Sequence, residues 1–305
     1  LARHTEYVAG HLTVVINRVL AERSDLVLDV QDVRGNPFRS VRIVEPRLRF
    51  RGERGPVVLE ARSMSLSYAP WDLAFGRTRS LEVRLERPVV RLVRGADGRL
   101  RLPAWRPGPK RAGPAREFDV RLTLADATIE LPDTSLGVRG LELTARARLG
   151  RGERVEIERM RWARGPWDSR LEDLRGRFTA GDSARFEVTS LRTGDVELTA
   201  HGGWRAGAPT RFAHVELKRL RWSWLAKVFA NDLFDVSGQG AGRFDLRFGR
   251  GLSGSGVAEA VWDSVPLQAR ADFRWRDGRL AVGPLLGTSP AGTFDGRVSY
   301  TASEL

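Results

Sequence analysis

Few side chains in this 305-residue chain have the type and spacing that catalysis or metal binding requires. Cysteine is absent, so disulfides and thiolate metal sites are excluded. The histidines, His4, His11, His201 and His214, mostly lie far apart and form no His-x-x-x-His or Glu-x-x-His pair. His4 and His11 would share a helix face two turns apart, which is too far for one ion. We therefore expect no metal centre and no cofactor.

Motifs for nucleotide binding and nucleophilic catalysis are also missing. There is no Gly-x-Ser-x-Gly elbow and no P-loop. The run Gly238–Gly242 begins like a dinucleotide fingerprint, but an alternating strand follows it, so we interpret it as bulges or a close backbone approach. Acids such as Glu156 and Glu158 fall on the charged side of their predicted strand. We infer that the chain is not an enzyme.

The elements that would position any site are strands. From about Leu26 to Tyr300, apolar residues alternate with charged ones, mostly arginine, as in Val120–Leu124 and Phe244–Phe248. A period of two places the apolar side chains on one face of a strand and the charges on the other. Almost no helix is predicted to cover the apolar face. We therefore predict a mainly β fold, a long, curved antiparallel sheet that forms a U-shaped apolar groove.

The organisation along the chain follows from interruptions of this alternation. Apolar spacing predicts an amphipathic helix within residues 1–23, which would cap the first sheet edge and could also contact a membrane anchor upstream. A first β segment spans 24–105, a proline-rich linker spans 106–116, and a continuing β segment spans 117–305. Short helical pieces are expected at 70–76 and 224–231. Asp97-Gly98 and Asp277-Gly278 predict hairpin turns.

The net charge of +13 raises the alternatives of nucleic-acid or anionic-membrane binding. However, lysine occurs only at positions 110, 218 and 227, and the arginines are spread through many strands among glutamates. This distribution favours a solvated outer face. Aromatic pairs such as Phe273 and Trp275 could stack bases, but they are mixed with aliphatic rather than basic residues, as in an apolar trough.

One segment resembles a known family. Leu85–Pro103 carries an Arg-Pro-x-Val-x-Leu strand, an Asp-Gly-x-Leu hairpin and Leu-Pro, and it follows a Trp-Asp-Leu-Ala-Phe-Gly turn at 71–76. This order resembles the N-terminal region of the TamB and AsmA-like proteins of Gram-negative bacteria. The resemblance covers Leu1 to Trp105 and is looser afterwards, where it depends on strand pattern and on Gly238–Leu246.

The resemblance implies a periplasmic, bridge-like lipid transfer protein that carries phospholipid between the inner and outer membranes. It also implies an inner-membrane anchor upstream of this chain and an outer-membrane partner, a barrel of the protein-insertase class. Since the chain begins with Leu1 rather than Met, we expect it to be a piece of a longer protein. No run of eighteen apolar residues is present, so we expect no membrane-spanning segment within it.

Residue pattern and resemblance together predict which side chains line the groove. Ile43 and Leu48 differ in parity, so the prediction requires a bulge between them, which we place at Pro46. The predicted lining residues are Val41, Ile43, Leu48, Phe50, Leu59, Leu66, Leu81, Val83, Leu85, Val120, Leu122, Leu141, Leu143, Phe186, Val188, Phe244, Leu246, Phe273 and Trp275. For each residue the alternative is ordinary packing against the opposite wall.

Three functional hypotheses follow from the sequence. The first is a lipid conduit, in which apolar side chains shelter acyl chains and head groups stay in solvent. The second is a structural or assembly scaffold for outer-membrane protein biogenesis, whose trough closes on itself or guides its clients. The third is a basic nucleic-acid binder, which we do not expect. No residue here supplies energy, so the direction of transport would be set elsewhere.

Overall fold

The computed structural model shows a mainly β protein with two compact units, Leu1–Arg170 and Leu171–Leu305. The structure describes residues 14, 17–18, 20–22, 24–36, 40–52, 55–68, 79–95, 100–101, 118–132, 137–149, 153–165, 169–181, 183–205, 211–224, 237–249, 251–276 and 279–301. Most of the predicted N-terminal helix, the segment 70–76, the linker 106–116 and residues 225–231 of the helical piece expected at 224–231 lie outside these residues. Residues 222–224 are helical.

The first unit begins with short strands that pair in two halves. Its strands are β1 (Leu26–Asp29), β2 (Asp32–Asn36), β3 (Ser40–Val44), β4 (Arg47–Phe50), β5 (Val57–Glu60), β6 (Ser63–Tyr68), β7 (Arg79–Glu86), β8 (Val89–Arg91), β9 (Val93–Arg94), β10 (Leu100–Arg101), β11 (Phe118–Glu130), β12 (Val138–Leu149) and β13 (Glu153–Trp162). One half has the antiparallel order β2-β3-β6-β7, and the other has the antiparallel order β1-β4-β5-β8. The consecutive strands β1 and β2, β3 and β4, β5 and β6, and β7 and β8 thus form four long strands. Each long strand is interrupted once, and the four interruptions lie side by side in the sheet.

At the breaks, the backbones of adjacent strands are still joined by hydrogen bonds across the sheet. Glu45 and Arg87 have φ values of 47° and 49°, and each precedes a fully buried proline, Pro46 or Pro88. Proline cannot donate to a ladder, and a left-handed residue turns the strand, so pairing stops and restarts there. The line of breaks remains hydrogen-bonded, since the Glu45 amide donates to Arg62 and the Arg87 amide to Ala125. At Pro46, where parity predicts a bulge, the strand is interrupted between β3 and β4.

The first unit closes through a parallel pairing. The first half of β11 lies parallel to β7, and its end lies parallel to β8, while β12 and β13 continue antiparallel beyond it. Asp126, with a φ of 54°, marks the corresponding break in β11. The sheet is therefore mixed rather than purely antiparallel, which corrects the prediction. Strands on both sides of the linker 106–116 pair with each other, and both belong to the first compact unit, which extends to Arg170.

The first unit has a packed hydrophobic core at its first strands. Val33, Val41 and Ile43 are each at most 4% exposed and pack with one another. Partly buried Val30, Met64, Leu66 and Tyr68 surround them. At the start of the sheet, the Asn17 side chain donates to the Leu28 carbonyl and accepts from its amide, both at 2.8 Å. The backbone amide and carbonyl of Leu28 thus form hydrogen bonds with a side chain in place of a neighbouring strand.

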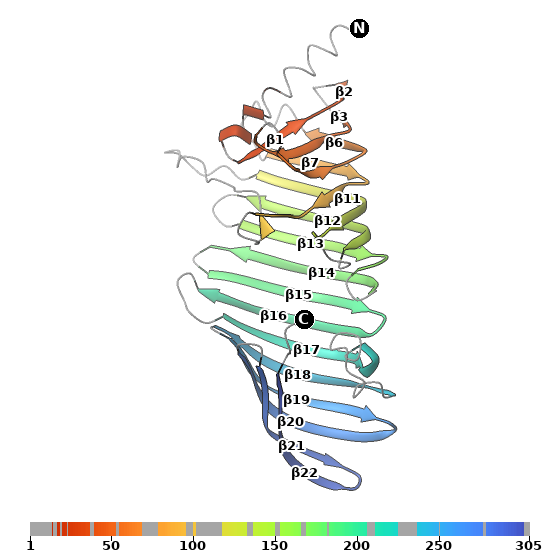
Figure 1. Cartoon of the computed structure of the whole chain (residues 1–305), viewed down its shortest axis with the longest axis vertical. Helices are drawn as coiled ribbons and strands as arrows, with labels where there is room; N and C mark the ends of the chain where they lie inside the picture. Colours follow the sequence, from red (N-terminus) through yellow and green to blue (C-terminus); the bar gives the residue numbers. More distant parts are fainter. Residues whose placement is uncertain are drawn as a thin grey trace. The chain divides into compact units, whose positions relative to one another are not determined.

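The second unit is an uninterrupted antiparallel meander. Its strands pair in sequence order, as Figure 1 shows from green to blue. They are β14 (Leu171–Ala180), β15 (Ser183–Thr193), β16 (Val196–Arg205), β17 (Arg211–Arg221), β18 (Gly238–Phe248), β19 (Leu252–Trp262), β20 (Val265–Arg276), β21 (Arg279–Ser289) and β22 (Gly292–Thr301). The pairing of Arg276 with Arg279 agrees with the hairpin predicted at Asp277-Gly278.

The Gly238–Gly242 run has a structural role in β18. Its pairing with β19 continues without a shift from Gly238 to Phe248, whereas the register with β17 shifts between Leu217 and Leu220. The extra residue of that shift belongs to β17, because three steps on β17 match two on β18. The glycines therefore mark a close approach, since a Cβ at Gly240 would meet the Trp222 ring at 3.1 Å. Of the two interpretations of this run, the structure supports the close approach.

Candidate functional site

The apolar residues of the first unit form continuous rows across its strands. Residues directly paired in a ladder point to the same face. One row runs through Val41, Leu66, Val83, Leu122, Ala145 and Ile157. The next runs through Ile43, Met64, Leu85, Leu124, Leu143 and Met160. We call these rows, with the parallel row of Tyr68, Leu81, Val120, Ala147 and Val155, the first apolar face.

The second unit carries equivalent rows, although their residues are smaller. One row contains Phe178, Phe186, Gly202, Ala213, Leu246, Gly254, Phe273 and Val282. A second contains Gly176, Val188, Ala200, Val215, Phe244, Gly256, Ala271 and Leu285. A third contains Leu174, Leu191, Leu198, Leu217, Gly242, Ala258, Ala269, Gly287 and Phe294. We call these three rows the second apolar face.

Aromatic rings of the second apolar face lie over glycines of neighbouring strands. A Cβ added to Gly202 would come within 2.7 Å of the Phe186 ring, and one added to Gly254 would lie 2.7 Å from the Phe273 ring. Phe244 covers Gly256 in the same way. Such aromatic rescue fills the space that a missing side chain leaves on a sheet. The rings therefore lie along the sheet, and the face has low relief.

The predicted lining residues all lie within the described residues, and none of them is exposed. Five are buried in the packed parts of the sheet and offer little surface to a ligand: Val41, Ile43, Phe50, Leu85 and Leu141. The other fourteen are half-buried. Register joins most of them directly, as in Leu66 with Val83 and Val83 with Leu122. Leu48 and Leu59 pair beyond the line of breaks, and Trp275 pairs with Leu252 and Leu280.

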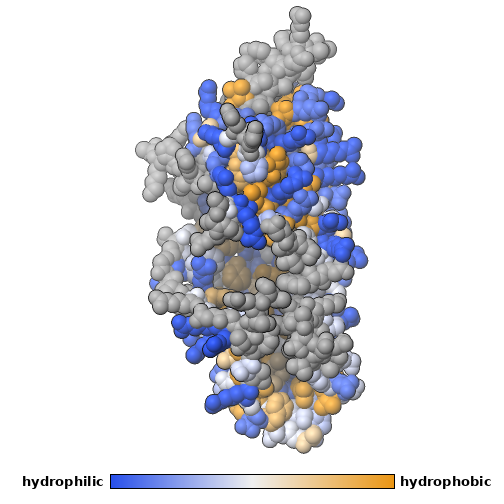
Figure 2. Space-filling model, in the orientation of Figure 1, coloured by the Kyte–Doolittle hydropathy of each residue, from blue (hydrophilic) through white to orange (hydrophobic). Residues whose placement is uncertain are grey.

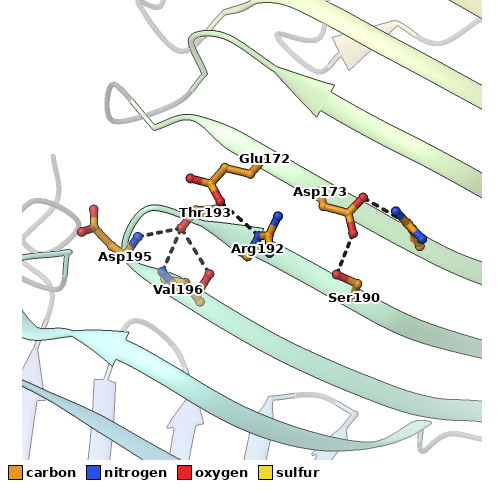
Figure 3. Close-up of polar contacts among 8 residues, drawn as sticks. Glu172, Asp173, Ser190, Arg192, Thr193, Asp195 and Val196 are labelled. Carbon is orange, nitrogen blue, oxygen red and sulfur yellow. Dashed lines mark hydrogen bonds and ion pairs between the residues drawn. The ribbon is translucent and has the colours of Figure 1, made fainter.

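The opposite face carries the charges. In the first unit, cross-strand ion pairs join Arg42 to Glu86 at 3.1 Å and Arg148 to Asp119 at 2.9 Å. In the second unit, Arg192 pairs with Glu172 at 3.1 Å, as Figure 3 shows. Exposed pairs of this kind each contribute between 0 and about 1 kcal/mol. Many arginines thus have acidic neighbours, and the positive charge is not gathered into one patch.

In one charged cluster, the interactions between the side chains shift the pKa values of two members, Glu60 and Arg91. Arg91 on β8 donates to Glu60 on β5 at 2.7 Å and to Glu130 on β11 at 2.9 Å. The hydrogen bond from Arg91 lowers the pKa of Glu60, although partial burial opposes that shift. The same bond raises the pKa of Arg91. The cluster ties β5 to β8 and β8 to β11.

The space-filling view shows where hydrophobic residues gather on one side of the molecule. Over the first unit, hydrophobic residues gather in a strip between hydrophilic ones in Figure 2. The hollows lined by described residues lie mainly along charged rows instead. One hollow of about 700 Å³ is lined by Glu82, Arg121 and Arg146, which share a row on the charged face. Leu81, Val120 and Ala147 of the first apolar face also line it.

Sequence reasoning missed one constellation, which lies on the charged face of the second unit. His201 and His214 are direct partners across β16 and β17, and their ring centroids are 5.1 Å apart. In the sequence, the two histidines lie at nearly equal distances from residues 206–210, which connect β16 to β17. This equal spacing is the signal that could have predicted their pairing across two consecutive antiparallel strands. Among the described residues, no three histidine, aspartate or glutamate side chains converge as a metal-binding group.

Comparisons with known proteins give no family assignment. No protein-family model, no curated protein and no solved structure matches this chain. Across the part of the chain that the structure describes, no helix has the length and hydropathy needed to cross a membrane.

Proposed function

We propose that the two apolar faces bind the acyl chains of phospholipids and that the protein transfers phospholipid between the inner and outer membranes across the periplasm. The observation that carries this proposal is the continuity of apolar rows across the strands of each unit. Within the described residues, no helix lies over these rows as a second layer. A sheet face of this kind needs an apolar partner.

The energetics suit reversible binding along a path. Each methylene removed from water contributes about 0.8 kcal/mol, so an acyl chain gains stability in proportion to the length that it buries. Half-buried residues such as Val83, Leu122 and Leu246 retain surface for this contact. The low relief of the second apolar face provides few deep pockets that would trap a chain at one place. We infer that acyl chains slide, while head groups remain in water.

The cellular setting belongs to the same proposal. We propose a periplasmic protein of a Gram-negative bacterium, joined to the inner membrane by an upstream anchor and assisted by an outer-membrane barrel of the insertase class. The resemblance of Leu85–Pro103 to the TamB and AsmA-like family supports this setting. We expect neither enzymatic activity, a cofactor nor nucleic-acid binding in this role.

The second candidate function is a scaffold for outer-membrane protein biogenesis. The buried cluster of Val33, Val41 and Ile43 favours it, because at these strands the apolar side chains already pack against protein. On this hypothesis the sheet closes on itself and its other surfaces guide a client. The two hypotheses differ in whether lipid occupies the half-buried residues of the faces.

Site-specific photo-crosslinking tests the conduit directly. A photoreactive amino acid is placed at Val83, Leu122 or Leu246 on the apolar faces. Matched controls place it at the next residue along each strand, Arg84, Thr123 or Arg247, which points to the opposite face. After irradiation in cells, mass spectrometry of the purified protein identifies phospholipid adducts.

The conduit predicts phospholipid adducts at the three apolar positions, at least fivefold above their controls. Equal labelling of both faces, or no lipid adduct at any apolar position, would overturn it. Adducts with outer-membrane proteins at the apolar positions would favour the scaffold. Oligonucleotide binding that weakens steeply with salt would instead indicate a nucleic-acid binder.

A further inference from the structure

The β16–β17 hairpin brings together two imidazoles that are thirteen residues apart in the chain. His201 and His214 lie on the charged face, opposite Ala200, Val215 and the rest of the second apolar face. Both rings are accessible, since His201 is exposed and the His214 side chain is 38% exposed. Because they lie on the face opposite the proposed lipid contact, they are available for a separate function.

The ring separation matches chelation of one ion. Zinc–nitrogen bonds of about 2.0–2.1 Å at roughly tetrahedral angles place two imidazole centroids about 5 Å apart. The observed centroid distance is 5.1 Å, with the ring planes inclined by 40°. The register thus holds the two rings at a separation that suits one ion bound between them.

A carboxylate already orients one of the rings. The Nδ1 atom of His214 lies 2.7 Å from Oδ1 of Asp245, its partner on β18. This contact leaves Nε2 of His214 as the nitrogen available to a metal. Metal-binding histidines usually hold a carboxylate on their second nitrogen, which fixes the tautomer and makes the ring a better ligand.

The surroundings favour a cation. Glu187 is the direct partner of His201 on β15, so a carboxylate lies on each side of the histidine pair in the row Glu187, His201, His214 and Asp245. His214 and Asp245 also border an open hollow of about 780 Å³, with room for water to complete the coordination of an ion. Negative charge near imidazole ligands offsets the charge of a divalent ion.

We infer that His201 and His214 form a surface site for a divalent transition metal, zinc or copper, with Asp245 as the group that orients His214. Imidazole nitrogens select zinc, copper and nickel over magnesium and calcium, which prefer oxygen ligands. With two protein nitrogens and water as the other ligands, binding is reversible and faster to exchange than at a closed four-ligand site. The linear spacing of the histidines had predicted no metal centre, and the hairpin register changes that expectation.

Titration calorimetry with Zn²⁺ on the full 305-residue chain, without a histidine tag, tests the site. We expect one Zn²⁺ per chain and no binding of Mg²⁺ or Ca²⁺. His201→Gln and His214→Gln should each weaken binding at least tenfold, and Asp245→Asn about tenfold through loss of orientation. The double variant H4Q/H11Q is the matched control, because it removes the other two histidines and should bind as the wild type does.

Electron paramagnetic resonance of the unmodified chain with Cu²⁺ keeps the test independent of any variant's folding. One equivalent should show coupling to two imidazole nitrogens. Absence of saturable Zn²⁺ binding, a Cu²⁺ spectrum with fewer than two nitrogens, or loss of binding in H4Q/H11Q would overturn the inference. Unchanged binding in both His201→Gln and His214→Gln would do the same.

Discussion

The strands β1–β8 and the strands β18–β22 share the same alternating pattern, yet they bury it very differently. Among the described residues, Val33, Val41, Ile43 and Phe50 of the early strands are at most 4% exposed. In the late strands, Leu246, Phe273 and Leu285 of the second apolar face are only half-buried, and no large apolar side chain is buried among the described residues after Ala213. Alternation therefore determines which face is apolar but does not determine whether that face is covered.

The breaks in the early strands explain the difference. The left-handed residues Glu45 and Arg87 and the buried prolines after them turn each long strand part of the way along its length. The packed cluster of Val33, Val41 and Ile43 lies on the strands β2 and β3, directly before this break. β18 and β19 pair over their whole length without a shift, and β19 presents only Gly254, Gly256 and Ala258 to the second apolar face. An unbroken strand of this kind cannot bring its own two ends into contact.

The largest effect should come from removing core volume in the early strands. Ile43→Ala leaves a cavity in the packed cluster and should lower the free energy of unfolding by about 2–4 kcal/mol. Leu285→Ala is the matched substitution on the half-buried second apolar face of the late strands and should lower it by only about 1 kcal/mol. Urea unfolding followed by hydrogen-exchange mass spectrometry reports each unit separately. Similar losses for both variants would contradict the contrast drawn between the two regions.

A second effect tests whether aromatic rings need the glycines beneath them. Gly256→Val introduces a side chain that meets the Phe244 ring and lies within 3.0 Å of the Arg243 carbonyl oxygen. The free energy of unfolding of the second unit should fall by about 1–3 kcal/mol. Gly296→Val is the control, because a Cβ there meets no atom within 4 Å. A neutral Gly256→Val would mean that the ring is not held against the strand.

The β15–β16 turn should respond more weakly. The Thr193 hydroxyl accepts from the amides of Val196 at 2.8 Å and Asp195 at 3.2 Å, as Figure 3 shows. Thr193→Val removes both bonds, together with the one that the hydroxyl donates to the Val196 carbonyl at 3.4 Å, and should lower the free energy of unfolding by about 1 kcal/mol, measured by thermal unfolding. Thr189→Val, which removes one weak exposed bond to Arg175, should cost less than half as much. Equal costs would argue against a special role for the turn.

The smallest effect concerns the charged cluster of the first unit. Because Arg91 holds the pKa of Glu60 below its ordinary value, ionised Glu60 stabilises the folded state at neutral pH. That contribution should disappear as the pH falls through the lowered pKa. Glu60→Gln should therefore cost less than about 1 kcal/mol at pH 7, since the pair is one-third exposed, and nothing in strong acid.

Urea unfolding between pH 7 and pH 2 measures this difference. Glu153→Gln, at the exposed start of β13, is the control and should show no such dependence. A Glu60→Gln cost that grows as the pH falls would contradict the assignment.

Sequence reasoning predicted the strands and the face of each strand because alternation is a local property. It also singled out Pro46, where the strand is interrupted between β3 and β4. The parallel pairing of β11 with β7 and β8 could not be predicted, because alternation is the same for parallel and antiparallel neighbours. The proximity of His201 to His214 needed the hairpin register, and the packing of Phe244 over Gly256 needed the distance between adjacent strands. Each of these features depends on which strands become neighbours.

The parallel closure of the first unit also has a consequence for folding. In the second unit every described pairing joins consecutive strands, so each step closes only a short loop. Pairing Arg79 with Phe118 must instead close a loop of nearly forty residues before β12 and β13 can add to a finished edge. Loop closure costs entropy before native contacts repay it, and non-local pairing slows folding. The meander of the second unit should therefore acquire hydrogen-exchange protection first. In the first unit, the pairing of β11 with β7 should be the slow step of folding.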